Sequence, residues 1–260
     1  MIRPASFNGV IGFKPSYGAI STEGLIPLAP SLDHVGFFAQ DIDLAQLAAA
    51  VLCANWDAEL RFEGQPILAI ATGKYLAQAE PKMFSRFWQV VEALEQAGYW
   101  VKRLDAMPDF DEIVQRHDLI LAAEASRVHA DWYRLYSQRY HSRTLELIER
   151  GQEIDDETLE ESLREAAAFS TRMSTLLAMH CIDLWLSPAA PGPAPKGLDS
   201  TGNPVMNLPW TQAGFPTLNL PMGTDKQGLP LGLQVSADFG QDEALLAWAA
   251  EVENLLKGLQ

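Results

Sequence analysis

The chain is poor in cysteine and in positive charge, and it has no long apolar run. Only two of its 260 residues are cysteine, and 19 Lys and Arg stand against 34 Asp and Glu, which gives a formal net charge of −15. Such an acidic chain repels a phosphate backbone, so we expect no nucleic-acid partner. No window approaches the roughly 20 apolar residues of a membrane-spanning helix. We therefore expect no membrane insertion and, without a visible signal peptide, a cytoplasmic location.

The two cysteines and five histidines do not form a recognisable ligand or catalytic pattern. Cys53 and Cys181 have apolar neighbours and lie in neither a Cys-x-x-Cys pair nor a metal-ligand spacing. They are typical of small buried side chains in a reduced compartment. His117, His129 and His141 recur at even intervals in a helical region, which we interpret as a surface pattern. We predict no metal site and no histidine-based triad.

The order of periodic segments predicts an α/β protein. Residues 1–38, rich in Gly and Pro, favour turns and short strands. Asp41 is typical of an N-cap before a helix. Residues 66–71 and 99–104 favour strands, with an amphipathic helix over 84–97 between them, which indicates a parallel βαβ unit.

The second half continues this pattern. The chain is mostly helical over about 110–179, with breaks at His141-Ser142 and Gly151-Gln152, and returns to a strand over 182–188. The Pro/Gly-rich stretch 188–209 is either a linker or a functional loop. Two strands, 217–221 and 229–236, flank a hairpin turn at 225–228, and Asp242 begins a last helix. We predict a mixed, largely parallel twisted sheet flanked by helices on both faces, in one domain.

Three ordered blocks carry a family resemblance. The first runs from Met1 to Gly18 and includes Arg3-Pro4-Ala5 and Gly12-Phe13-Lys14-Pro15. The second is Ser31-Leu32-Asp33 with Val35-Gly36. The third begins at Pro209-Trp210-Thr211-Gln212-Ala213-Gly214-Phe215-Pro216 and continues through Gly228 to Gln234. Together they resemble the amidase signature family, whose members hydrolyse amides with a Ser-Ser-Lys triad.

The resemblance implies that the triad lies outside residues 1–260. Alignment on Pro4 and Ala5 puts the family's nucleophile serine one position before Met1, and Lys14 matches a lysine that follows the nucleophile in the family, not the catalytic one. No Gly-Ser-Ser-Gly loop occurs in the chain. We therefore expect residues 1–260 to be the C-terminal part of an amidase signature domain, an incomplete fold with a helical insertion at about 105–180.

The resemblance also suggests residues that border a substrate cleft, although it assigns no catalytic residue. Arg3 would hold a substrate carboxylate or, alternatively, brace a loop through backbone carbonyls. Trp210 and Thr211 lie in a loop that borders the cleft in the family, with core packing as the alternative for Trp210. Ser187 and Pro191 lie at the exit of a predicted strand, where open α/β sheets place ligand contacts, with a purely geometric loop role as the alternative.

Two classes of function follow. In the first, the full-length form attacks a small amide or carbamoyl carbonyl through an acyl-serine intermediate, with no metal or organic cofactor, and this chain alone is inactive. In the second, the chain is a non-catalytic pseudo-enzyme or interaction module, or half of a split amidase. The expected partner of the full-length form is a small-molecule amide. The expected partner of this chain is a second copy of itself or a missing N-terminal half. Without that half, exposed sheet edges favour self-association.

Overall fold

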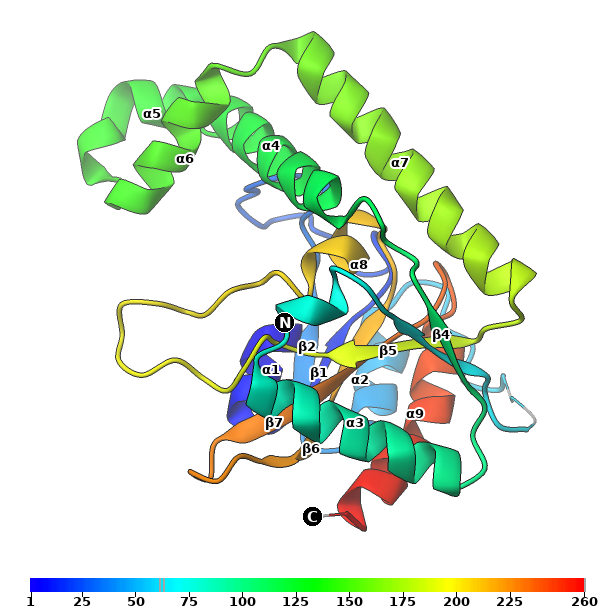
Figure 1. Ribbon diagram of the computed structural model, residues 1–260. Coiled ribbons are helices and arrows are strands. Elements are labelled where there is room, and N and C mark those ends of the chain that lie inside the picture. Colours follow the sequence, from blue (N-terminus) through cyan, green and yellow to red (C-terminus); the bar gives the residue numbers. More distant parts are fainter. Residues whose placement is uncertain (61, 63, 260) are drawn as a thin grey trace.

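A computed structural model describes residues 1–60, 62 and 64–259 of the chain. At its centre these residues form a seven-stranded sheet in the order β2-β1-β6-β7-β5-β3-β4 (Figure 1). The strands are β1 (Ile11–Lys14), β2 (Phe37–Ala39), β3 (Leu68–Ala71), β4 (Val101–Leu104), β5 (Leu184–Pro188), β6 (Thr217–Thr224) and β7 (Pro230–Ser236). The α-helices are α1 (Ile2–Asn8), α2 (Ile42–Leu52), α3 (Pro81–Gln96), α4 (Phe110–Val128), α5 (Ala130–Tyr136), α6 (Ser142–Gln152), α7 (Asp156–Met179), α8 (Leu208–Gln212) and α9 (Asp242–Lys257).

The sheet is mixed, as predicted, but it is not largely parallel. Only β3–β4 and β3–β5 run parallel among the described residues, whereas β1–β2, β1–β6, β5–β7 and β6–β7 are antiparallel. Parallel pairs need a long crossover, and the β3-α3-β4 segment supplies one, as predicted. The tight turn after Asp225 joins β6 and β7 instead, and a tight turn can link only antiparallel neighbours.

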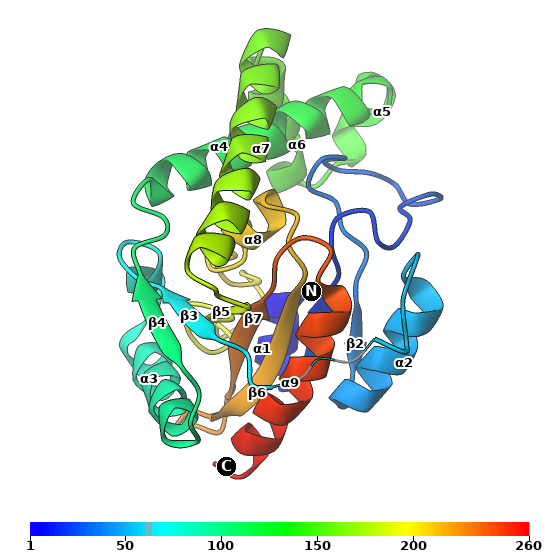
Figure 2. The same cartoon turned by 90° about the vertical axis from the view of Figure 1, so that its right-hand side faces the viewer.

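Helices cover both faces of the sheet, and each face has its own core. The alternation of side chains along a strand sends Leu68 and Ile70 to a core with α2, α3 and α9, and Ala69 and Ala71 to a core with α4, α7 and α8. Figure 2 shows α9 lying along the sheet, with α4 and α7 extending above it. Of the predicted helical middle, the start of α4 and the end of α7 therefore pack against the sheet, while α6 packs on α4.

The chain begins with the helix α1, although the Gly and Pro content of residues 1–38 predicted turns and short strands. Pro4 lies in the first turn of α1, where its missing N–H costs no hydrogen bond. Gly9 ends the helix with φ 65°, a left-handed conformation that suits glycine. Gly12 lies directly under α1, since a Cβ there would come within 2.4 Å of Ala5 Cβ. α1 and β1 are therefore in close contact.

The helical region of about 110–179 has the predicted breaks. Its histidines, however, do not all lie on the surface as predicted. His141 caps α6, with Nδ1 accepting from the Arg143 N–H, and α6 ends at Gln152. His117 and His129, however, are each only 8% exposed. The helical neighbours Ile113 and Ile120 pack into cores and bring His117 inward, whereas His129 packs against Trp132 and Tyr140. Cys53 is buried as expected, but Cys181 is exposed, because its chain position falls in the turn that follows α7.

Among the described residues, no helix is both long and apolar enough to cross a lipid bilayer.

Candidate functional site

A cavity of about 220 Å³ lies where the start of α1, β1, α4 and α8 meet. Its wall combines the first turn of the chain with side chains from distant segments. The described residues that line it are Met1, Ile2, Arg3, Pro4, Lys14, His117, Pro204, Asn207, Leu208, Thr211, Thr217 and Gln234. Ligand pockets for drug-sized molecules are roughly 300–1,000 Å³, so this cavity suits a small ligand.

Lys14 is buried in this wall at the end of β1. Its Nζ donates to the carbonyl oxygen of Phe215 at 2.5 Å. Burial lowers the pKa of Lys14 from its ordinary value of 10.5 to about 7, and the nearby Asp242 carboxylate offsets only part of that effect. Asp242 is itself bound to Ser16, with Oδ1 accepting from the backbone N–H at 2.8 Å. Burial thus brings the pKa of the Lys14 amine close to neutral pH.

Arg3 connects α1 to the loop that precedes α8. Its Nη1 donates to the carbonyl oxygen of Gly202 at 2.9 Å, and Nη2 donates to Thr201 Oγ1 at 3.3 Å. Nε is buried and has no partner among the described residues. Burial lowers the pKa of Arg3, but a guanidinium keeps its charge at neutral pH. The geometry is that of the bracing alternative.

His117 reaches the cavity from α4. Its Nδ1 is buried and has no hydrogen-bond partner within the described residues. Burial lowers the pKa of His117 to about 4, against a smaller opposing effect of Asp118. The imidazole is therefore neutral at pH 7 and has one N–H to donate.

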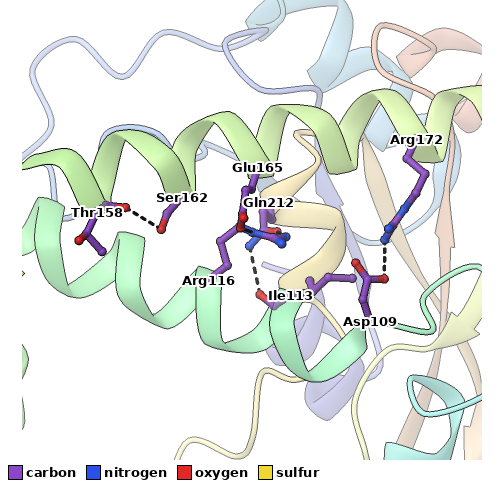
Figure 3. A network of polar contacts seen from close by, with 8 residues as sticks. All are labelled: Asp109, Ile113, Arg116, Thr158, Ser162, Glu165, Arg172 and Gln212. Atoms are coloured by element: carbon purple, nitrogen blue, oxygen red, sulfur yellow. Dashed lines mark hydrogen bonds and ion pairs between the residues drawn. The ribbon is translucent and has the colours of Figure 1, made fainter.

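Polar contacts fix α4 in the position that presents His117 (Figure 3). Arg116 is the central residue: Nε pairs with Glu165 of α7 at 2.9 Å, and Nη1 donates to Gln212 Oε1 at 3.1 Å. Gln212 in turn donates to the carbonyl oxygen of Ile113 at 3.2 Å. At the start of α4, Arg172 Nη2 of α7 donates to Asp109 Oδ1 at 2.6 Å. One side of α4 is thus tied to α7 and α8.

Beneath the cavity lies a buried polar network centred on the Tyr75 hydroxyl. Tyr75 donates to Ser187 Oγ at 2.9 Å, and Trp210 Nε1 donates to the Tyr75 oxygen at 2.8 Å. Gln234 Nε2 donates to Ser187 Oγ at 2.8 Å, while Gln234 Oε1 accepts from Asn207 at 2.7 Å. Burial raises the pKa of Tyr75, so the phenol stays protonated. Gln234 and Asn207 also line the cavity and join it to this network.

The predicted site residues fall into three places. Arg3 and Thr211 line the cavity. Trp210 and Ser187 are each 1% exposed and belong to the buried network below it. Pro191 lies apart, and its carbonyl oxygen accepts the N–H of Glu80 at the start of α3, at 2.7 Å.

Sequence reasoning missed His117, Gln234 and Tyr75. Two of them carried a readable signal. His117 shares a helical face with the apolar Ile113 and Ile120, which predicts a buried ring. Gln234 is a polar residue within an apolar strand, where burial requires a partner. Tyr75 carried none, because its partners come from segments more than 100 positions away.

Comparison with known proteins identifies the family. A family model described as Amidase matches residues 2–246, and the chain belongs to this family, as predicted. It is 27% identical to one of the subunits of the glutamyl-tRNA(Gln) amidotransferase of Koribacter versatilis (strain Ellin345), over 98% of this chain and 62% of the relative. It is 26% identical to Amidase 1 of Arabidopsis thaliana, over 94% of this chain and 65% of the relative.

Solved structures agree with the fold. A crystal structure of an amidase superimposes with a TM-score of 0.87 at 26% identity, covering 98% of this chain and 60% of the other. A 6-aminohexanoate cyclic dimer hydrolase shares the fold, with a TM-score of 0.81 at 19% identity, and the match covers 98% of this chain and 62% of that one. The chain thus spans about 60% of the length of the relatives it matches.

Proposed function

We propose that this chain is the C-terminal part of an amidase-signature hydrolase that cleaves a small amide or carbamoyl C–N bond. The observation that carries the proposal is the location of the cavity. Met1, Ile2, Arg3 and Pro4 line it, and the alignment on Pro4 and Ala5 puts the family's nucleophile beside Met1. In such a reaction a hydroxyl attacks the carbonyl carbon, the amine leaves, and water hydrolyses the acyl ester. This chain would supply the wall that binds and orients the acyl group.

The proposal includes inactivity of the isolated chain. A Ser-Ser-Lys triad needs a lysine amine within hydrogen-bond reach of a serine hydroxyl. In the part of the chain that the structure describes, no hydrogen bond joins a lysine to a serine, and Lys14 donates to backbone carbonyls instead. Ser16, the serine nearest to it in the sequence, is bound to Asp242. These contacts support a scaffold role for Lys14.

An activity assay and a labelling experiment test both parts. The purified 260-residue chain is incubated with chromogenic small amides and with a fluorophosphonate that modifies activated serines. We expect neither turnover nor an adduct. A polypeptide that corresponds to the remaining N-terminal part of the relatives is then added, and turnover is expected to appear. Turnover by the isolated chain would contradict the inactivity, and persistent inactivity of the mixture would contradict the hydrolase proposal.

A matched pair of variants ties that activity to the cavity. Thr211 lines the cavity, whereas Thr224 is exposed at the far end of β6. In the reconstituted mixture, Thr211→Val is expected to lower kcat/KM, and Thr224→Val to leave it unchanged. Equal effects of the two substitutions would separate the activity from this cavity.

A non-catalytic interaction module is the second candidate, and the apolar surface beside β2 favours it. The edge strand β2 carries Phe38, which is 51% exposed, and the neighbouring α2 exposes Leu47 and Val51 at 64% and 76%. An unpaired apolar edge invites another chain. The occupant would be a second copy of this chain or the N-terminal part of the relatives. Light scattering decides between them: self-association of the purified chain supports the first, and a monomer that binds the added N-terminal polypeptide supports the second.

A further inference from the structure

A second cavity, of about 410 Å³, lies between the first half of α3 and the turn that joins β6 to β7. The hairpin and α3 lie close together at the lower end of the sheet in Figure 1. This cavity shares no lining residue with the cavity at the start of α1. Its volume is within the range of roughly 300–1,000 Å³ that sites for small organic ligands have.

Cations gather around this second cavity, although the chain as a whole is acidic. Lys82, Arg86 and Lys226 line it together with one carboxylate, that of Asp225. The Asp225 side chain is 1% exposed and already has its partners: Oδ1 accepts from two backbone N–H groups of the hairpin turn at 2.8 and 3.1 Å, and Oδ2 pairs with Lys82 at 3.2 Å. Three cations against one anion leave two positive charges for a ligand.

Arg86 is held in position by neutral groups. Its Nε donates to the carbonyl oxygen of Met222 at 2.6 Å, and longer bonds run from Nη1 to Gln89 Oε1 at 3.3 Å and from Nη2 to the carbonyl oxygen of Leu259 at 3.4 Å. Gly223 has φ 108°, and a Cβ there would lie 3.1 Å from Nη2, so this glycine leaves room for the guanidinium. A guanidinium has five N–H groups, and these three bonds leave two of them for a ligand.

We propose that this cavity binds a small organic phosphate, with the phosphate group between Arg86, Lys82 and Lys226. A phosphate monoester carries about −1.5 to −2 charges at neutral pH, which matches the two positive charges that the wall leaves uncompensated. The planar fork of a guanidinium suits two phosphate oxygens at once, and each lysine adds a point charge. The Ser85 hydroxyl, one turn after Lys82 in α3, lines the cavity as a further donor.

The apolar part of the wall accounts for the organic part of the ligand. Pro81 and the buried Leu231 line the cavity beside the cations, and their side chains cannot bond a phosphate oxygen. They can pack against a compact apolar group, whose removal from water is favourable. The cavity therefore favours a phosphate ester over inorganic phosphate.

Binding of matched probes to the unaltered 260-residue chain tests the inference. Phenyl phosphate and phenyl sulfate have nearly the same shape, but at about pH 8 the phosphate ester is a dianion and the sulfate ester a monoanion. In calorimetric titrations at low salt, we expect phenyl phosphate to bind at least about tenfold more tightly than phenyl sulfate. It should also bind more tightly than inorganic phosphate, which lacks the apolar group.

Charge-matched variants supply the control. Arg86→Gln is expected to lower the affinity for phenyl phosphate at least about tenfold. Arg103→Gln removes the same charge from a guanidinium that is paired with Glu95 at 2.8 Å, and it should leave the affinity unchanged. Because Arg86 also braces Met222, a second variant, Lys226→Gln, changes only an exposed turn residue. It should weaken binding by a smaller factor than Arg86→Gln.

Four results would overturn the inference. Phenyl phosphate and phenyl sulfate could bind equally, or neither could bind. Inorganic phosphate could bind as tightly as phenyl phosphate, which would leave no role for the apolar wall. The affinity could also stay unchanged in Arg86→Gln and Lys226→Gln, or fall as much in Arg103→Gln as in these variants. In that last case the ligand would respond to the charge of the whole chain and not to this cavity.

Discussion

Two polar clusters adjoin each other in this protein and differ in how their groups are paired. The side chains of Ser187, Trp210 and Gln234 all form hydrogen bonds with the Tyr75 hydroxyl, at 2.8–3.2 Å. In the cavity above, Arg3 and His117 keep buried nitrogens without partners among the described residues. Gln234 belongs to both clusters. The two clusters therefore differ in the pairing of their polar atoms, although both are buried.

The paired cluster has a structural consequence. It links β3, β5, β7 and α8 through one hydroxyl, because Tyr75 follows β3, Ser187 lies in β5, Gln234 in β7 and Trp210 in α8. A low local dielectric makes such bonds strong when all are formed and costly when one is lost. Because this network holds α8 and β7 in place, the cavity wall does not depend on hydrogen bonds of its own unpaired donors.

Among the substitutions in the two clusters, removal of the Trp210 indole is expected to lower the free energy of unfolding the most. Trp210→Ala deletes a fully buried indole and the hydrogen bond to Tyr75, and such substitutions lower the free energy of unfolding by about 3–5 kcal/mol. Urea denaturation measures the loss. Trp100→Ala is the control, because Trp100 is 76% exposed. A similar loss in both variants would argue that the network does not hold α8.

Loss of one amide from the network should cost less. Gln234→Leu leaves the Asn207 amide and the Ser187 hydroxyl short of a partner, which we expect to lower the free energy of unfolding by about 1–3 kcal/mol. Gln227→Leu, on the exposed β6–β7 turn, should be nearly neutral. Equal midpoints in urea for Gln234→Leu and the unaltered chain would show that the network contributes little.

The buried Lys14 amine at the cavity makes the stability of the folded chain depend on pH. Its pKa is about 7 in the folded protein against an ordinary value of 10.5, so the unfolded chain binds more protons between these two pH values. This lysine therefore makes the folded state more stable as pH rises through that window, by up to about 1.4 kcal/mol per pH unit. The free energy of unfolding is measured from about pH 7 to pH 10 for the unaltered chain and for Lys14→Met.

The slope with pH should be shallower in Lys14→Met than in the unaltered chain. Lys226→Met, at an exposed turn position, serves as the control and should keep the original slope. Parallel curves for all three proteins would mean that the Lys14 amine is not buried.

The smallest expected change in the free energy of unfolding is the difference between substitutions of His117 and of His129. His129→Leu removes the partner of the Tyr140 hydroxyl and should lower the free energy of unfolding by about 1 kcal/mol. His117→Leu takes an unpaired nitrogen out of the interior, so we expect no loss or a slight gain. Thermal unfolding of the two variants side by side measures the difference. A larger loss for His117→Leu would contradict the unpaired state of its ring.

Much of the fold is predictable because it is local. The β3-α3-β4 unit, the β6–β7 hairpin and the start of α2 at Asp41 follow from short-range signals: apolar periodicity, Gly and Pro at the ends, and a capping carboxylate that accepts from Leu44 at 2.8 Å. The direction of the remaining pairings was not predictable in this way. β1 pairs with β6, some 200 residues further on, and no local pattern near Phe13 specifies that Leu218 will lie opposite it.

The candidate site was predictable in part. The ordered motifs indicated Arg3 and Thr211, which line the cavity, because family motifs cluster in the loops around a cleft. Trp210 and Ser187 were indicated as well, but their side chains point into the network below. The burial of the His117 ring could have been predicted from its helical face, but its place at the cavity could not, because it depends on contacts of α4 with α7 and α8, which are far apart in the chain.

The order of amino acids was enough to assign the family, the α/β class and most element positions, because these depend on ordered motifs and on periodicities that neighbouring residues carry. Three properties became visible only in the folded chain: which strands run antiparallel, which of the evenly spaced histidines are buried, and which polar side chains meet around one cavity. The reason is physical. Pairing, burial and local charge are properties of side chains brought together across long stretches of chain, and such encounters are not written in any single stretch.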